Sequence, residues 1–379
     1  MNLQELMRVV LYTPGVNGRW GLPVIFEGKP GTAKTSRITR ESAALHLDTI
    51  TLIASLREPT DFAGFAVPEK GSIKRYVEKW VDKCMDLDNC VVFLDELNTA
   101  PPSVQKALLR VVLEGVVGDS CLPIGVRFVA AQNSVDDAAD GYELSAALAN
   151  RFGHIQWPAP SAAEWALALN SGFGGDINVV DPAATAKMQD YVTKKWDAAY
   201  GRAAALVSGF IMRRTDLLNF KPKTGIAVAS PRTWEMATRA LSGCFIHNAS
   251  DDTRNELISA FIGDGPASEL IAFITSADLP DATKYLDGTE RWTPNPRRMD
   301  TTFAMLQMCV NVIKDTTVDA TKRKRVDTYM MMLEQLRAAG TTDIAVSGIG
   351  YLQKVTGVYQ ILISEARYVD IMAALNSIM

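Results

Sequence analysis

Short apolar runs alternate with longer segments of helical spacing over residues 1–160. The apolar runs predict strands, and they lie at 22–26, 49–53, 90–94, 126–131 and 154–157. Helices are expected between them, at 36–47 and 103–113, while Gly118-Asp119 inside 116–124 predicts a small hairpin. Alternation of strands and helices predicts a parallel sheet with helices on both faces. The run 91–94 contains no polar residue, which is typical of a central strand buried on both sides.

The pattern becomes helical after Trp157-Pro158-Ala159-Pro160, a stretch with the composition of a linker. Apolar residues then recur three or four positions apart, as at Met299, Phe303, Leu306, Val310 and Ile313. A proline-rich stretch at 278–296 marks a further boundary. We therefore expect an α/β core at 1–158, an all-α lid at 159–277 and a helical C-terminal extension at 278–379.

Composition narrows the class of protein. The chain has 379 residues, of which 47% are hydrophobic and 22% are charged, with a net charge of -4. These values predict a globular chain of two or three domains and give no reason to expect a nucleic-acid or membrane partner. There is no apolar run of membrane-spanning length and no signal-peptide pattern. The five cysteines are scattered and the three histidines form no ligand cluster, so we expect a reduced, cytoplasmic protein.

A phosphate-binding loop is predicted directly after the first strand. Residues 28–35 read Gly-Lys-Pro-Gly-Thr-Ala-Lys-Thr, close to the pattern G-x-x-x-x-G-K-[ST] between a strand and a helix. Backbone N–H groups of such a loop converge on phosphate oxygens, and the next helix points its positive end at them. Lys34 is expected to reach the β and γ phosphates of ATP, and the Thr35 hydroxyl to bind Mg²⁺. The predicted ATP contacts are Gly28, Pro30, Gly31, Thr32, Ala33, Lys34, Thr35 and Ser36.

Ala33 departs from the pattern because glycine is usual at that position. The position lies at the start of the helix, where we expect a right-handed backbone that tolerates a methyl group.

Two carboxylates follow the apolar strand at 90–94. Asp95 and Glu96 come at its carboxyl end, where ligands bind in parallel α/β sheets. Asp95 is predicted to help hold Mg²⁺, and Glu96 to orient or deprotonate the attacking water. Two exposed acids at the start of a loop are common, so it is the combination with the phosphate loop that favours this interpretation.

Three further residues are candidates for sensing or completing the site. Asn133 ends another apolar run, and its amide could hold the lytic water against the γ-phosphate. Arg151 lies just before the last strand of the core, and an arginine inserted into a neighbouring subunit's site can accelerate phosphoryl transfer strongly. Arg232 follows Ser230-Pro231 at the expected start of a lid helix and is predicted to contact the nucleotide.

Together these motifs resemble the MoxR group of AAA+ ATPases. In that group alanine before the loop lysine is usual, so Ala33 supports the resemblance. Residues 94–109, Leu-Asp-Glu-Leu-Asn-Thr-Ala-Pro-Pro-Ser-Val-Gln-Lys-Ala-Leu-Leu, are similar to its acidic strand and following helix. Residues 56–65 look like its helix-2 insert, and 116–124 like the insertion before the first sensor. The resemblance is specific over 20–155, weaker over 156–245 and absent beyond about 280.

The resemblance implies functions that the residues alone do not. Asn133 matches the first sensor, Arg151 the arginine finger and Arg232 the second sensor. It also implies a homo-oligomeric ring, usually hexameric, that hydrolyses ATP with Mg²⁺ at sites shared between subunits. Members act as chaperone-like remodellers of a protein substrate, often with a von Willebrand A-domain partner.

Two other functions stay open from the sequence. A nucleic-acid-associated motor or restriction-type NTPase subunit would use the basic run at 321–325, with Arg291, Arg297 and Arg298 nearby. A solvated helix face is the simpler interpretation of that run, because acidic residues dilute its charge. A non-hydrolysing scaffold is the other alternative, and the intact pair of Asp95 and Glu96 argues against it.

Overall fold

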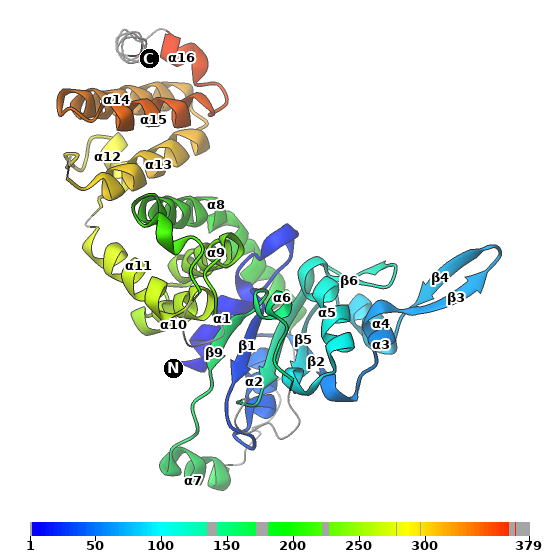
Figure 1. The fold of residues 1–379 in the computed structure, drawn as a ribbon. Helices are drawn as coiled ribbons and strands as arrows, with labels where there is room; N and C mark the ends of the chain where they lie inside the picture. Colours follow the sequence, from blue (N-terminus) through cyan, green and yellow to red (C-terminus); the bar gives the residue numbers. More distant parts are fainter. Residues whose placement is uncertain are drawn as a thin grey trace. The chain divides into compact units, whose positions relative to one another are not determined.

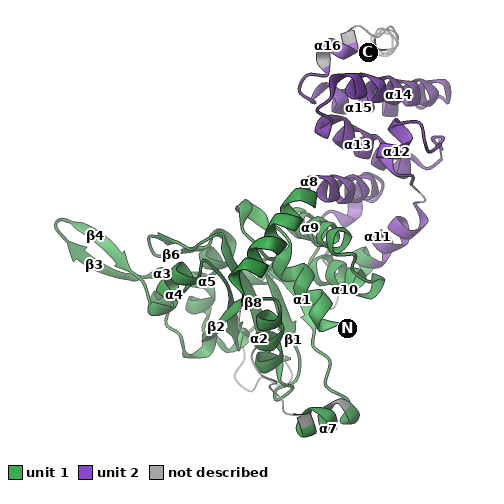
Figure 2. Cartoon of the chain, turned by 180° about the vertical axis from the view of Figure 1, so that it is seen from behind, with its two compact units in different colours: residues 1–196, 219–267 green, residues 197–218, 268–379 purple. Residues whose placement is uncertain are grey.

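The computed structural model describes residues 2–134, 142–171, 181–221, 227–277, 279–295, 297–363 and 368 (Figure 1). The chain forms two compact units, coloured separately in Figure 2. Unit 1 comprises Met1–Trp196 and Asn219–Ala267, and unit 2 comprises Asp197–Leu218 and Ser268–Met379. The predicted three-part division of the chain stays a prediction.

Unit 1 is built on a five-stranded parallel sheet with the order β2-β5-β8-β1-β9. Each strand lies within two residues of a predicted one. The strands are β1 (Val24–Glu27), β2 (Asp48–Ile53), β5 (Asn89–Asp95), β8 (Gly125–Gln132) and β9 (Gly153–Gln156). The predicted α/β fold is therefore confirmed.

Helices cover both faces of this sheet. On β5, Cys90, Val92 and Leu94 belong to one apolar cluster, and the alternate residues Val91 and Phe93 must point to the opposite face. All five are fully buried, so neither face meets water. The covering helices include α1 (Leu3–Tyr12), α2 (Lys34–Ala44), α4 (Lys79–Leu87), α5 (Pro102–Glu114) and α6 (Ala146–Ala149).

Two hairpins extend from the core. The expected one at 116–124 forms from β6 (Val116–Val117) and β7 (Ser120–Cys121). A longer one, from β3 (Phe65–Glu69) and β4 (Ser72–Tyr76), is exposed along its whole length and was not predicted as strands. It follows α3 (Pro59–Ala63) and stands away from the sheet in Figure 1.

The helices of unit 1 within 219–267 include α9 (Pro231–His247) and α10 (Asp251–Ile262). Ser230 caps α9 and Pro231 occupies its first turn, as the sequence predicted. Helix α9 packs against α1, and α10 packs against β9, where the ring of Phe261 lies over Gly153. A helix α7 (Ala162–Ser171) follows β9, and the long helix α8 (Pro182–Arg213) contributes residues to both units.

Unit 2 is helical and includes α12 (Ala282–Leu286), α13 (Met299–Asp315), α14 (Asp319–Ala338), α15 (Thr342–Gln353) and α16 (Tyr359–Ile363). Helix α11 (Asp264–Ser276), like α8, contributes to both units.

Methionines Met305, Met308, Met330 and Met332 are buried in the core of unit 2, whereas Met331 is exposed. The buried Asp300 accepts hydrogen bonds from Arg213 at 2.8 Å and Arg298 at 3.1 Å. No helix in the described parts of the chain is long and apolar enough to cross a membrane.

Candidate functional site

The strand order brings three predicted motifs to one edge of the sheet. Strand β8 lies between β5 and β1, and all three run parallel. The loop after β1, Asn133 after β8 and Asp95 at the end of β5 therefore lie side by side at the carboxyl edge. Ligands bind at this edge in open α/β sheets.

Lys34 is the central cation of the site. Its side chain is buried, and Nζ donates hydrogen bonds to the carbonyl oxygens of Gly28 at 2.8 Å and Lys29 at 2.9 Å. Nζ also donates to Oδ1 of Asn133 at 3.1 Å. The sequence-predicted sensor amide therefore contacts the sequence-predicted phosphate lysine directly. Phosphate oxygens would replace these neutral acceptors with charged ones, which form stronger hydrogen bonds.

The backbone of the loop turns twice through the left-handed region. Gly31 has φ 73°, a conformation that glycine adopts without strain. Ala33 has φ 60° and ψ 30°, so the expectation of a right-handed backbone there is wrong. For alanine this conformation costs about 1–2 kcal/mol. It lets α2 begin at Lys34 directly after the turn and point its N-terminal N–H groups into the loop.

Trp157 holds the loop from the end of β9, a role that the sequence did not predict. The segment from Trp157 looked like a linker, but this ring is buried and Nε1 donates to the carbonyl oxygen of Thr32 at 3.2 Å. A Cβ at Gly28 would lie 2.7 Å from the Trp157 carbonyl oxygen, so residue 28 must be glycine. Phe26 meets the ring edge-on, and the Arg37 guanidinium lies over it.

Thr35 and Asp95 lie together as the metal prediction requires. Oγ1 of Thr35 donates to Oδ2 of Asp95 at 2.5 Å. A hydroxyl and a carboxylate oxygen suit Mg²⁺, which is usually bound by one or two carboxylates together with substrate phosphates. The described residues contain no group of three His, Cys, Asp or Glu side chains that could hold a metal ion alone. The pair of oxygens therefore fits a metal that arrives with a nucleotide.

Glu96 is exposed at the same edge and has a left-handed backbone, with φ 55° and ψ 42°. Its carboxylate Oε2 accepts a hydrogen bond of 2.7 Å from Oγ of Ser55, just beyond the end of β2. Strained residues of this kind cluster at active sites. Ser55 is a contact that the sequence did not predict, because it depends on β2 pairing with β5.

Asn98 is a second unpredicted contributor. It is buried, and its Nδ2 donates to the backbone carbonyl oxygen of Asn133 at 3.0 Å. This bond fixes the backbone that presents the Asn133 side chain to Lys34.

Arg151 and Arg232 lie elsewhere. Both line a cavity of about 290 Å³ in unit 1 whose wall includes Leu22 and Pro23, which precede β1, and no residue of the loop 28–35. Burial, and then the positive charge of Arg232, lower the pKa of Arg151. The structure therefore brings these two arginines to each other rather than to Lys34.

The comparison with protein families agrees with the geometry at the carboxyl edge. Residues 23–152 match the family model described as AAA domain (dynein-related subfamily). These residues form an AAA ATPase domain. A crystal structure of a candidate ATPase from Cytophaga hutchinsonii ATCC 33406 is similar, with 16% identity, a TM-score of 0.47 and coverage of 69% of this chain and 80% of that chain. A comparison with curated proteins finds no match.

The AAA domain spans the phosphate loop, the acidic strand end and Asn133, and it ends just after Arg151. The protein is therefore an ATPase, and ATP is its substrate.

Replacing Ser55 by alanine is expected to raise the basal rate of ATP turnover several-fold. The hydrogen bond from Ser55 engages Oε2 of Glu96, an oxygen that the attacking water would otherwise contact. A bond to a charged but exposed group is worth about 1 kcal/mol, or about fivefold in rate. Phosphate release by purified Ser55→Ala, with Ser55→Thr as the variant that keeps the hydroxyl, measures the effect. A large loss of turnover in Ser55→Ala would instead mean that Ser55 holds Glu96 in its working position.

Proposed function

We propose that this ATPase is a MoxR-type, chaperone-like remodeller that assembles into a ring, such as a hexamer, and uses ATP hydrolysis to act on a protein partner. A von Willebrand A-domain protein is one candidate partner, and the cytoplasm is the expected compartment. The observation that carries the proposal is the separation of Arg151 from the phosphate loop of its own chain. An arginine finger at that position can serve only the site of a neighbouring subunit.

Within this proposal the residues at the carboxyl edge have distinct roles. The loop from Gly28 to Ser36 binds the phosphates, and Lys34 neutralises the β and γ groups. Thr35 and Asp95 would hold Mg²⁺, which would supply positive charge next to the phosphates. Glu96 orients and deprotonates the attacking water, and Asn133 positions it.

The exposed β3–β4 hairpin is one reason to propose a protein partner. Its paired residues Phe65 and Tyr76 share one face with Val67, and all three side chains are at least 41% exposed. Exposed apolar patches of this kind commonly mark interaction sites. The N–H of Arg75 on β4 donates to Oδ2 of Asp119 in the turn between β6 and β7, so the two hairpins are in contact.

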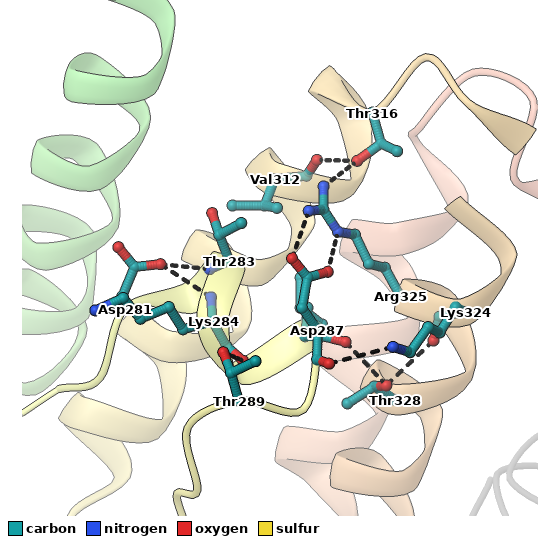
Figure 3. Close-up of polar contacts among 11 residues, drawn as sticks. Asp281, Thr283, Lys284, Asp287, Thr289, Val312, Thr316, Lys324, Arg325 and Thr328 are labelled. Atoms are coloured by element: carbon teal, nitrogen blue, oxygen red, sulfur yellow. Dashed lines mark hydrogen bonds and ion pairs between the residues drawn. The ribbon is translucent and has the colours of Figure 1, made fainter. Parts of the chain in front are cut away.

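Contacts inside unit 2 argue against the nucleic-acid alternative. Two basic residues of the run at 321–325 are engaged inside the unit, as Figure 3 shows. Arg325 forms a bidentate pair with Asp287, at 2.8 and 3.0 Å, and Lys324 donates to the Asp287 carbonyl oxygen. This pair lowers the pKa of Asp287 and raises that of Arg325. We therefore interpret the run at 321–325 as the part of α14 that contacts the segment after α12.

The ring is tested by measuring molar mass with and without ATP. Light scattering of the Glu96→Gln variant, chosen to retain ATP, is expected to show a closed oligomer of several subunits when ATP and Mg²⁺ are present. The Arg151→Ala variant is expected to bind ATP and to hydrolyse it at least a hundredfold more slowly. A monomer under all conditions with full turnover would contradict the proposal, because Arg151 would then have no site to complete.

A further inference from the structure

A second cavity of unit 1 lies away from the ATP loop. It has a volume of about 400 Å³ and is formed by α1, α8 and the end of α9. No residue of the loop 28–35 lines it. The first turns of α8, which line it, lie beyond the far end of α2, because Oγ1 of Thr185 donates to the carbonyl oxygen of His46 at 2.7 Å. The eleven residues of α2 separate that end from the loop by about 16 Å. The cavity is therefore distinct from the site of ATP hydrolysis.

Basic side chains dominate the wall of this cavity. Arg8 from α1, Lys187 from α8 and His247 from α9 all line it, and no acidic side chain of the described residues does so. Lys187 forms no hydrogen bond or ion pair within the described part of the chain. The guanidinium of Arg8 donates only to a neutral acceptor, the carbonyl oxygen of His247 at 3.4 Å. Three basic groups that converge without a carboxylate favour an anionic ligand.

The acids next along α1 and α8 are engaged elsewhere. The carboxylate of Glu5 accepts hydrogen bonds from the hydroxyls of Ser250 and Thr253, at the start of α10. Asp190 accepts a hydrogen bond of 2.6 Å from Nζ of Lys194, one turn further along α8. These contacts leave the basic groups of the cavity to a ligand.

Two buried nitrogen atoms of the wall, Nε of Arg8 and Nε2 of His247, have no hydrogen-bond partner among the described residues. His247 is only 9% exposed. Burial, and then the charge of Arg8, lower the pKa of His247 to about 4, so its ring is neutral near pH 7. The ring donates to the backbone of Tyr12, which leaves an unshared electron pair on Nε2. A matching ligand must donate a hydrogen bond to Nε2 and accept one from Nε of Arg8.

We propose that this cavity binds a singly protonated phosphate group, either free or in a small organic monoester. The P–O–H group donates to Nε2 of His247, and other phosphate oxygens accept from Nε of Arg8 and from the Lys187 ammonium. A phosphate group has a second pKa of about 6 and so keeps this proton at little cost near neutral pH, whereas a sulfate ester has no such proton. Met188 and Ile246 line the same cavity and offer an apolar surface to the organic part of a monoester.

Titration calorimetry with matched probes tests the site. The full chain with Lys34→Ala is used, because its ATP loop lacks the phosphate-binding ammonium. Phenyl phosphate is expected to bind at least tenfold more tightly than phenyl sulfate, which has the same shape but no proton for Nε2. Equal affinities, or no binding of either probe, would overturn the proposal. Inorganic phosphate distinguishes the two sources of the group: weaker binding than phenyl phosphate assigns the site to a monoester, and equal binding assigns it to free phosphate.

Substitutions in the same background locate the bound group. Lys187→Ala is expected to weaken phenyl phosphate binding about tenfold. His247→Phe is expected to abolish the preference for phenyl phosphate over phenyl sulfate, an effect that a merely structural role would not produce. The matched control is Lys83→Ala, which removes the same charge from an exposed position on α4 and should leave the affinity unchanged. Equal affinities of Lys187→Ala and Lys83→Ala for phenyl phosphate would contradict the site. Lys187 is exposed, so this comparison remains decisive even if His247→Phe fails to fold.

Discussion

The Lys34→Ala variant is expected to lose ATP turnover and to bind ATP more than a hundredfold more weakly. The Lys34 ammonium is the buried cation of the phosphate loop, and it donates to neutral oxygens of Gly28, Lys29 and Asn133 that phosphate oxygens can replace. Two hydrogen bonds to a charged phosphate are worth about 3 kcal/mol or more. Titration calorimetry with ATP and Mg²⁺, together with a phosphate-release assay, measures both losses.

A matched control for this variant is Lys29→Ala, since Lys29 lies in the same loop with an exposed side chain. It removes the same charge without removing a hydrogen bond to the loop, and we expect its ATP affinity to stay within a few-fold of the original. Equal losses in the two variants would mean that net charge, rather than the geometry of Lys34, binds the phosphates.

Replacing Glu96 by glutamine is expected to preserve ATP binding and to lower turnover by about 10²- to 10⁴-fold, the usual contribution of a general base. The amide keeps the size of the side chain and can still contact Ser55, but it cannot accept a proton from water. Single-turnover hydrolysis and ATP affinity, measured on the same preparation, separate the chemical step from binding. The matched control is Asp86→Asn, an exposed acid on α4. If Glu96→Gln hydrolyses ATP as fast as Asp86→Asn, Glu96 is not the base.

The sheet could be predicted from the sequence because its strands are short apolar runs ended by turn residues. The sequence also predicted which residues lie at the carboxyl edge of this sheet, since parallel strands bring their carboxyl ends together. The left-handed backbone at Ala33 could not be predicted in this way, because residue type alone favours the right-handed region and the closure of the loop decides otherwise. The β3–β4 hairpin was also missed. Its strands are exposed on both faces and one contains Pro68, so they lack the alternation that marks a half-buried strand.

The other contacts that the sequence did not predict join distant parts of the chain. Trp157 supports the phosphate loop and Ser55 contacts Glu96 only after the strands have paired. The position of Arg232 depends on how α9 packs against α1, which no local pattern reports. Of these three residues the sequence singled out only Arg232 as a candidate, and it indicated the neighbours of none of them.

The place of β1 between β8 and β9 also has a consequence for synthesis of the chain. Val24 pairs with Val129 on one side and with Gly153 on the other. The segment that carries the phosphate loop is made early, yet both of its neighbouring strands emerge from the ribosome much later, and contacts so distant in sequence form slowly. We expect nascent chains that end before β9 to lack nucleotide affinity. An unfinished polypeptide would then present a nearly continuous apolar segment at 22–26 to the chaperones that attend translation.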